Sequence, residues 1–435
     1  LVTLATCDLG AIVRGRAIFA DELPDHLGAG IGWVPANQAL TPLGPLADGD
    51  PFGSTGDLRL LPVPEARLRI EAPEGVTGRG VLDLVLCDIV ELDGRPWEAC
   101  TRALLRATLE RMQRDLGAHA LVAFEHEFQI LDAGPPSPGF SLRAQRAAEP
   151  FGSELMGALR DARLGPERFF SEFAPHQFEL PLAPTQALAA ADRAVLFREA
   201  VHEIAAREGS RCTFVPLLDP AEAGNGVHIH VSLQDDRGAP LLYDAGRPGA
   251  LSALGAGFAA GILAHAEALT ALTAPSPVSA ARLGPHHWSA GAISLGLQNR
   301  ETLLRIPPIV ALADRGAAEQ LRLEFRACDA AANPYLALAA VLSAGMDGIR
   351  AGLAAPPVLA SDPATLDAED AERYGVGALP GDLGASLRAL EEDEVALAWL
   401  PALLRDAYFA VKRTEIAAAE GEDLLDTCRR YAGIY

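Results

Sequence analysis

The stretch AHALVAFEHEFQIL, residues 118–131, places two glutamates, Glu125 and Glu127, inside an apolar run that is typical of a buried strand. Side chains two apart on a strand share a face, so both carboxylates point to the same side. Ionised carboxylates in a buried environment are costly unless positive groups meet them. The fold must therefore bring metal ions or basic side chains to this face.

Three more apolar segments carry polar residues that could bind metal ions together with Glu125 and Glu127 or supply positive charge. Taken alone, an E-x-E pair is an ordinary solvent-facing alternation, and an H-x-H pair is often two imidazoles with satisfied hydrogen bonds. Together, several glutamates and an imidazole form a ligand set typical of Mg²⁺ or Mn²⁺, and so many carboxylates indicate two or more ions. The additional candidates are His228 and His230 in GNGVHIHVS, Glu324 and Arg326 in LRLEFRACD, and Glu172, Gln177 and Glu179 in SEFAPHQFEL.

Arginines gather in the second half of the chain, at positions 282, 300, 305, 322 and 326. Metal ions combined with guanidinium groups are what phosphoryl transfer requires, because charge on the transferred group must be neutralised. The sequence contains neither a Walker-type phosphate loop nor a G-x-G-x-x-G fingerprint. We therefore expect any nucleotide to be held by metals and arginines.

Composition and pattern set the broad class. The chain has 435 residues, is 49% hydrophobic and carries a formal net charge of −22, which disfavours nucleic-acid and anionic membrane partners. Six scattered cysteines without a C-x-x-C pair, and no visible signal peptide or membrane span, favour a reduced, cytoplasmic protein with buried thiols.

Apolar periodicity divides the chain near residue 97. Short alternating runs separated by Gly/Pro-rich loops predict a small β-rich domain over 1–97, and the mixture of strands and long helices over 98–435 predicts a larger α+β domain with a mixed sheet. The expected helices are 101–116, 186–208, 251–273 and 334–352, and the expected strands are 119–131, 227–233 and 322–328.

These motifs, taken in order, resemble the glutamine synthetase family over nearly the whole chain. CDLGAIVRGRAI and LDGRPWEACTRALL resemble its N-terminal β-grasp domain, and AFEHEFQIL, EFAPHQFEL, GNGVHIHVS, NRETLLRIPP and LEFRACDAAANPYLALAAVLSAGMDGI follow in family order. The resemblance implies an α+β fold with a catalytic domain built on a curved antiparallel sheet, or half-barrel, packed with helices. It also implies a homo-oligomeric ring, such as a dodecamer of two hexamers.

The resemblance implies a role for each candidate residue. One metal ion would be held by Glu127, Glu172 and Glu179, and a second by Glu125, His228 and Glu324. ATP would contact His230, Ser232, Arg305 and Arg322. Arg300 would stabilise the transferred phosphoryl group, Arg282 would bind the α-carboxylate of glutamate, Arg326 would meet the reacting γ-carboxylate, and Gly224 would lie in the loop that covers the substrate. The implied reaction joins an acid to an amine through an acyl phosphate, with ATP as co-substrate.

Several positions depart from the family pattern. Where ammonia-using members carry a glutamate that closes the site, RLGPHHWSAG has Trp288, which offers an apolar wall or a π face for an organic ammonium. A packing aromatic at a shifted alignment is the alternative. The Asp-Gly-Ser-Ser segment is not evident, Ala223 stands where the family has an asparagine (with Asn225 two residues on), and Leu217 replaces a lysine.

We therefore expect an ATP-dependent γ-glutamyl ligase that takes an organic amine. The alternatives are a glutamine synthetase that uses ammonia, a non-catalytic binding or structural protein that kept the fold, and a metal-assisted hydrolase. His286 and His287 flank Trp288 and either line the amine entrance or are ordinary loop histidines.

Overall fold

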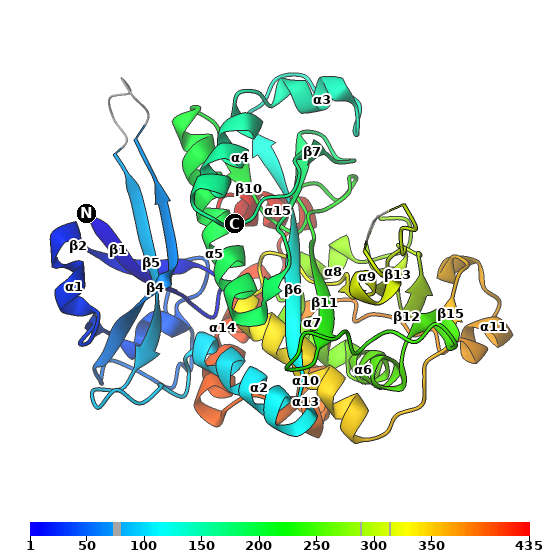
Figure 1. The fold of residues 1–435 in the computed structure, drawn as a ribbon. Coiled ribbons are helices and arrows are strands. Elements are labelled where there is room, and N and C mark those ends of the chain that lie inside the picture. Colours follow the sequence, from blue (N-terminus) through cyan, green and yellow to red (C-terminus); the bar gives the residue numbers. More distant parts are fainter. Residues whose placement is uncertain (73–79, 288, 313–314) are drawn as a thin grey trace.

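The computed structural model describes residues 1–72, 80–287, 289–312 and 315–435, and it contains two sheets surrounded by helices (Figure 1). The first sheet has five strands in the order β2-β1-β5-β4-β3. Only the β1–β5 pair is parallel. The strands are β1 Val2–Cys7, β2 Val13–Ile18, β3 Ile31–Trp33, β4 Leu58–Ile70 and β5 Leu82–Val90, which confirms the β-rich segment predicted before residue 97.

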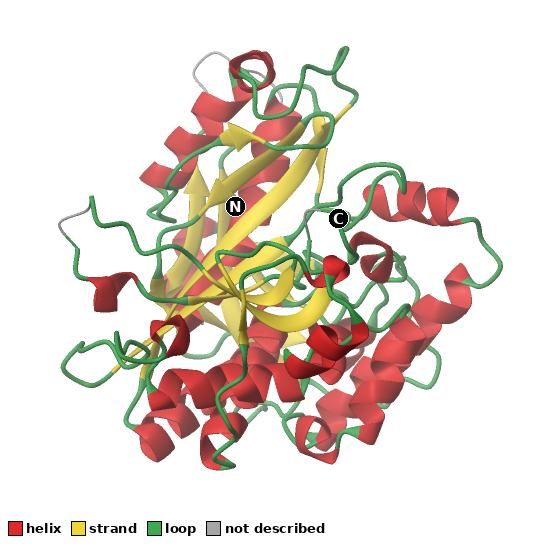
Figure 2. Cartoon of the chain, turned by 90° about the vertical axis from the view of Figure 1, so that its right-hand side faces the viewer, coloured by secondary structure: helices red, strands yellow, loops and turns green. Residues whose placement is uncertain are grey.

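The second sheet has ten strands and carries the polar motifs. Its main path runs β15-β12-β13-β14-β11-β6-β8-β7, with β9 and β10 both paired to β6. The strands are β6 His119–Leu131, β7 Phe170–Ser171, β8 Gln177–Pro181, β9 Thr185–Gln186, β10 Arg211–Thr213, β11 Val227–Gln234, β12 Ala292–Leu297, β13 Thr302–Ile306, β14 Leu323–Phe325 and β15 Val358–Leu359. Figure 2 shows the curved strands of this sheet, with helices behind and below them.

This sheet is mixed, as its widely spaced strands predicted. Pairing is antiparallel from β13 through β14, β11 and β6 to β7. At the other edge β12 pairs in parallel with both β13 and β15, so the expectation of an antiparallel sheet is wrong there. The reason is the chain path after Leu297, which returns so that Thr302 starts β13 beside Ala292 at the start of β12.

The helices follow the predicted apolar periodicity closely, with one exception. The interval 251–273 is broken at His265 into two helices bent by 74°. The helices are α1 Leu23–His26, α2 Thr101–Leu116, α3 Leu142–Ala147, α4 Phe151–Asp161, α5 Ala187–Arg207, α6 Ala253–Ala264, α7 Ala266–Thr273, α8 Ser279–Arg282, α9 Ala317–Gln320, α10 Pro334–Arg350, α11 Ala368–Arg373, α12 Leu383–Glu392, α13 Glu394–Leu397, α14 Ala402–Ala419 and α15 Leu424–Ala432.

Close helix packing explains the small residues of α6 and α10. A Cβ added to Gly261 would lie 2.1 Å from the Ala344 carbonyl oxygen, and one added to Gly348 would lie 2.2 Å from that of Gly257. The two helices therefore need glycine at their crossing. No single described helix is long and apolar enough to cross a membrane, whereas the bent pair α6–α7 together meets that test by length and composition.

Helix α5 packs against both sheets, contacting β4 on one side and β6 on the other (Figure 1). Polar contacts also join the N-terminal strands to the rest of the chain. The Asn333 side chain caps α10 by accepting from the Tyr335 and Leu336 amides, and its Nδ2 donates to the carbonyls of Cys7 and Asp8. One side chain thus begins a buried helix and anchors β1.

Candidate active site

Strand register places the predicted polar residues in one row across the curved sheet. Glu127 on β6 stands opposite Glu179 on β8, and Glu125 stands opposite His228 on β11. His230 then faces Glu324 on β14, and Glu324 faces Arg305 on β13. Directly opposed residues of antiparallel strands have Cβ atoms about 5 Å apart, so register alone brings these groups into contact.

The strand alternation predicted for residues 119–131 is confirmed by the residue between the two glutamates. His126 points to the other face of β6, where it is buried against Phe197 with ring centroids 4.6 Å apart. Burial lowers the pKa of His126 to about 3, helped by the charge of Arg198, so the ring is neutral. The glutamate face and the aromatic face of β6 are therefore chemically distinct.

One end of the row is crowded with negative charge. Burial raises the pKa of Glu127 to about 7, with a further contribution from the charge of Glu172. Burial, followed by the charges of Glu125, Glu127 and Glu172, raises the pKa of Glu179 to about 12. The pKa of Glu172 is also raised, chiefly by burial. Because these carboxylates resist ionising together, the cluster favours an added positive charge.

The other end of the row holds ionised carboxylates among bases. Glu125 Oε1 lies 3.3 Å from His228 Nδ1, and Glu125 Oε2 lies 3.1 Å from His230 Nε2. Burial opposes ionisation of Glu125, but these two hydrogen bonds hold its pKa well below the usual range. Glu324 is also buried, and the charges of Arg326, His230, His228 and Arg305 nevertheless lower its pKa to about 2.

The donor set suits divalent cations. Within the parts of the chain that the structure describes, no group of three or more His, Cys, Asp or Glu side chains is already arranged to hold an ion. The ligand atoms instead bond one another, as Glu125 does with the two histidines and Glu324 with Arg305. His228 Nε2 is nevertheless a buried nitrogen without a hydrogen-bond partner, 3.9 Å from Glu127 Oε1. The mutual repulsion of the carboxylates and this open nitrogen fit bound metal better than they fit a purely structural cluster.

Four of the five predicted arginines border the row. Arg305 NH1 donates to Glu324 Oε2 at 2.6 Å, and Arg326 NH1 pairs with the other oxygen of the same carboxylate. Arg322 Nε donates to His230 Nδ1 at 3.3 Å. Arg300 is exposed, and its charge acts on the Glu172 carboxylate.

The fifth arginine, Arg282, is fully buried beside the glutamate row. Its NH2 donates to the carbonyls of Ala327 and Cys328 at 2.7 and 3.0 Å. A Cβ on Gly224 would lie 2.6 Å from Arg282 Cγ, and also 2.1 Å from the Pro216 carbonyl oxygen. The predicted glycine loop and the predicted substrate arginine are therefore packed together.

Gly226 contributes to the site and was not among the predicted residues. Its amide donates to Glu127 Oε2 at 2.6 Å. An added Cβ would lie 3.0 Å from Arg282 NH1 and 3.1 Å from His228 Nε2. The second glycine of the G-N-G sequence was the available signal, because a glycine beside polar side chains often marks close backbone approach.

Asn225 takes a structural position rather than a substrate-facing one. Its Nδ2 donates to Gln129 Oε1 and to the Val215 carbonyl at 3.2 and 2.9 Å, and its Oδ1 accepts from Gln177 Nε2 at 3.0 Å. Asn225 is buried and its amide is saturated within the fold. It therefore does not substitute for the family asparagine missing at position 223.

The other residues singled out in the sequence take different positions relative to the glutamate row. Ser232 continues the face of His228 and His230 along β11 and is partly buried, and Leu217 is a core residue. His286 is exposed, with Nε2 2.9 Å from Asp362 Oδ2. Trp288 lies outside the described residues. All six cysteines are buried and unbridged, as predicted.

Comparison with known proteins agrees with this geometry. The family profile "Glutamine synthetase N-terminal domain" matches residues 1–97, and "Glutamine synthetase, catalytic domain" matches residues 98–424. A gamma-glutamylpolyamine synthetase GlnA3 of Streptomyces coelicolor is 34% identical over 433 residues, covering 97% of this chain and 91% of that protein. A glutamine synthetase of Methanocaldococcus jannaschii is 32% identical over 342 residues, covering 76% of this chain and 74% of that protein.

Solved structures are similar over the full length. A crystal structure titled a novel glutamine synthase homolog matches with a TM-score of 0.91 and 46% identity, covering 100% of this chain and 98% of that one. A structure titled a GmaS/ADP complex matches with a TM-score of 0.82 and 27% identity, covering 97% and 94%.

Proposed function

Because the chain belongs to the glutamine synthetase family of ATP-dependent carbon–nitrogen ligases, we propose that it joins the γ-carboxylate of glutamate to an organic amine. In the first step a carboxylate oxygen attacks the γ-phosphorus of ATP, and the bond to ADP breaks. In the second the amine nitrogen attacks the acyl carbon, phosphate leaves, and the nitrogen loses a proton. The observation that carries this proposal is the continuous row from Glu179 to Arg305, which pairs a carboxylate cluster with guanidinium groups.

The roles of the residues follow from their positions in the row. Glu127, Glu172 and Glu179 would hold one divalent cation, and Glu125, His228 and Glu324 a second. When bound, Mg²⁺ or Mn²⁺ would neutralise charge on the phosphates and orient them. Arg305 and Arg322 would bind phosphate oxygens, together with His230 and Ser232. Arg300 is exposed and its charge acts on Glu172, and it would meet the transferred phosphoryl group.

The acid would lie between Arg282 and Arg326. Arg282 directs NH2 to two carbonyls, while its Nε is buried without a partner. A substrate carboxylate would supply that missing acceptor. Gly224 and Gly226 would keep this side of the site free of Cβ atoms. Mispositioned acyl phosphate would be lost to water, so both glycines would matter for productive geometry.

An organic amine is favoured over ammonia by two features. Trp288 stands where ammonia-using relatives carry a glutamate, and one relative is named a gamma-glutamylpolyamine synthetase. Pro285 and Gly291, on either side of that loop, line a cavity of about 260 Å³ together with Glu301 and Asp362. These carboxylates would provide counter-charge for a second ammonium group on a diamine or polyamine.

A panel of amines tests this proposal directly. Protein, glutamate, ATP and Mg²⁺ would be incubated with ammonia, monoamines, diamines and polyamines, and phosphate release and product mass would be measured. We expect an organic amine to give the highest kcat/KM and a product with the mass of a γ-glutamyl amide. If ammonia were the best substrate, the proposed specificity for an organic amine would be refuted. If no acid–amine pair stimulated ADP formation, the proposed ligase activity would be refuted.

The ring assembly, the cytoplasmic location and a domain division at residue 97 also remain proposals. They rest on the family resemblance and on composition. Measuring the mass of the native particle in solution would test the assembly.

A further inference from the structure

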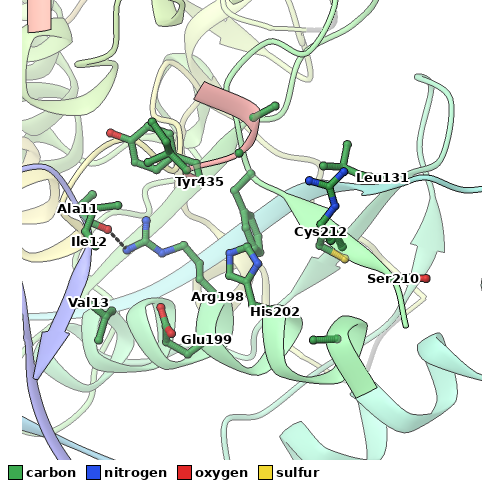
Figure 3. A pocket seen from close by; sticks show the side chains of 16 residues that line it. Ala11, Ile12, Val13, Leu131, Arg198, Glu199, His202, Ser210, Cys212 and Tyr435 are labelled. Carbon is green, nitrogen blue, oxygen red and sulfur yellow. Dashed lines mark hydrogen bonds between the residues drawn. The ribbon is translucent and has the colours of Figure 1, made fainter. Parts of the chain in front are cut away.

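A cavity of about 420 Å³ lies at the end of β6, lined chiefly by residues of α5, β10 and the end of the chain. Its wall combines segments that are far apart in sequence: the turn after β1, helix α5, strand β10 and the last residues of the chain (Figure 3). The volume falls within the range of about 300–1,000 Å³ that is typical of small-molecule sites. Nothing in the proposed ligase reaction uses this space.

The basic groups of this cavity are already engaged. Arg198 NH1 donates to the Ala330 carbonyl at 2.5 Å, and NH2 donates to the Ala11 carbonyl at 2.9 Å. Arg211 directs both Nε and NH2 to the Asp132 carboxylate, at 3.0 and 2.8 Å. The positive groups are therefore largely committed to oxygen atoms of the protein.

The acceptors of the wall are open by contrast. Glu199 and His202 lie one turn apart on α5, and their side chains point toward the cavity (Figure 3). In the described part of the chain, no hydrogen bond from another residue reaches the Glu199 carboxylate or the His202 ring nitrogens. Burial raises the pKa of Glu199 although the charge of Arg198 lowers it, and burial lowers the pKa of His202 to about 4, so the His202 ring is neutral.

The rest of the wall is apolar. Phe214 packs its ring against His202, with centroids 5.5 Å apart, and Leu131, Val13 and Ile434 complete a surface suited to a short hydrocarbon chain. An open carboxylate, a neutral imidazole that can accept a hydrogen bond and an apolar lining together select a ligand with a cationic donor and an apolar body.

We propose that this cavity is an effector site for a small alkylammonium compound, a primary ammonium group on a short apolar chain. The ammonium would lie against Glu199 and His202, and the chain would pack on Phe214 and its neighbours. Binding of the amine to this cavity does not depend on the proposed ligase function, whereas the effector role rests on the metal site proposed above.

Two contacts would transmit occupancy to the glutamate row. Arg198 ties the cavity to the Ala330 carbonyl, in the segment whose carbonyls at Ala327 and Cys328 hold Arg282. Phe214 also contacts His126, the residue that stands between the two glutamates of β6, and their ring centroids are 6.3 Å apart. A ligand that orders this wall would therefore alter the positions of Arg282 and of the candidate metal ligands, which is a physical basis for coupling between two sites.

The test uses n-pentylammonium as the probe, titrated calorimetrically into the full-length protein without nucleotide or metal. The neutral comparator is 1-pentanol, and the anionic comparator is pentanoate. We expect the amine to bind at least about tenfold more tightly than either comparator, and Glu199→Gln to weaken its binding by at least about tenfold, the effect of losing a charge-assisted hydrogen bond. Glu110→Gln, an exposed carboxylate on α2, is the matched control and should leave binding unchanged.

A second variant protects the test against misfolding. Ala206→Phe narrows the same cavity from α5 and keeps the Glu199 carboxylate, and it should also remove the binding. Coupling is measured by titrating Mn²⁺ with and without the amine, and the amine-dependent change in Mn²⁺ affinity should vanish in Glu199→Gln.

Equal amine affinity in wild type and both cavity variants, or preferred binding of pentanoate, would overturn the ammonium site. Binding without any change in Mn²⁺ affinity would overturn its role as an effector site.

Discussion

Glu125 on β6 and His228 on β11 stand directly opposite each other, with 3.3 Å between Oε1 and Nδ1. The two residues come from segments separated by about a hundred positions, and only strand register brings them together. Because His228 Nε2 remains without a hydrogen-bond partner while Nδ1 meets Glu125, the imidazole is oriented by one carboxylate and open on its other side. Nδ1 also lies 3.8 Å from Glu324 Oε1, so this nitrogen faces both carboxylates of the proposed second metal site, while Nε2 lies 3.9 Å from Glu127 Oε1 of the proposed first site.

Changing Glu127 to Gln tests the proposed carboxylate cluster. The variant should lose at least about a hundredfold in activity, since a ligand or near-ligand group is removed. In metal-free protein it should unfold at a higher temperature than wild type, because burial and the charge of Glu172 make the ionised carboxylate unfavourable. An assay of phosphate release measures the activity, calorimetric titration measures the Mn²⁺ affinity, and thermal unfolding measures the stability. Near-wild-type activity together with unchanged metal affinity would contradict the assignment.

Changing Gly226 to Ala tests whether close backbone approach matters for the chemistry. The new Cβ would lie 3.0 Å from Arg282 NH1 and 3.1 Å from His228 Nε2, so both side chains must shift. We expect kcat/KM to fall by at least about tenfold, because small misplacements of positioning groups are costly in catalysis. Gly28→Ala is the control, since nothing lies within 4 Å of its added Cβ. Equal kinetics for the two variants would show that the shift is harmless.

His202 makes stability sensitive to acid. Burial lowers its pKa to about 4, below the ordinary value of 6.5, so its contribution to stability is complete above pH 6.5 and is lost as the pH falls from 6.5 to 4. The loss amounts to about 3 kcal/mol at most. His202→Phe should flatten the fall of the unfolding free energy over this interval, measured by urea unfolding at several pH values. A variant curve parallel to that of wild type would exclude His202 as the source.

Asn333 should contribute more to stability than an ordinary helix cap. Asn333→Ala removes the cap of α10 and the two hydrogen bonds to the Cys7 and Asp8 carbonyls, which are then buried without that donor. The expected loss is about 3 kcal/mol. Asp382→Ala, which removes an exposed cap on α12, should cost about 1 kcal/mol. Chemical denaturation of both variants measures the difference, and equal losses would mean that anchoring β1 contributes little.

Sequence alone predicted the elements whose periodicity is strong. Helix α2 begins and ends at the predicted residues 101 and 116, and β6 spans the predicted 119–131, because one apolar face repeats without interruption. The strand expected at 322–328 is only Leu323–Phe325 in the structure. Arg326 lies beyond this strand, although its amide still donates to the Leu303 carbonyl at 2.9 Å, and its Nε donates to the Arg300 carbonyl at 3.1 Å, a contact between segments that no local pattern encodes.

The sequence predicted most of the residues that form the candidate site, but it did not predict which of them contact one another. Residues two apart on strands identified the glutamate and histidine pairs, yet the register that sets Glu179 opposite Glu127 depends on how separate segments align. The structural use of Asn225 and the closeness of Gly226 to Arg282 likewise arise from tertiary packing. The break at His265 was missed because α6 and α7 are both apolar enough to continue a single helical pattern.

The position of Glu324 has a consequence for how such a chain can diversify. The Glu324 carboxylate accepts hydrogen bonds from Arg305 through one oxygen and from Arg326 through the other. The same carboxylate therefore positions an arginine of the proposed nucleotide site and an arginine of the proposed acid site. A mutation that adapts the chain to a new acid would also disturb the nucleotide. The loop around Pro285 and Gly291 stands apart from this shared support, with its own cavity between Glu301 and Asp362. In the proposed reaction, substitutions in this loop could therefore exchange the amine while the binding of the acid and the nucleotide stays unchanged.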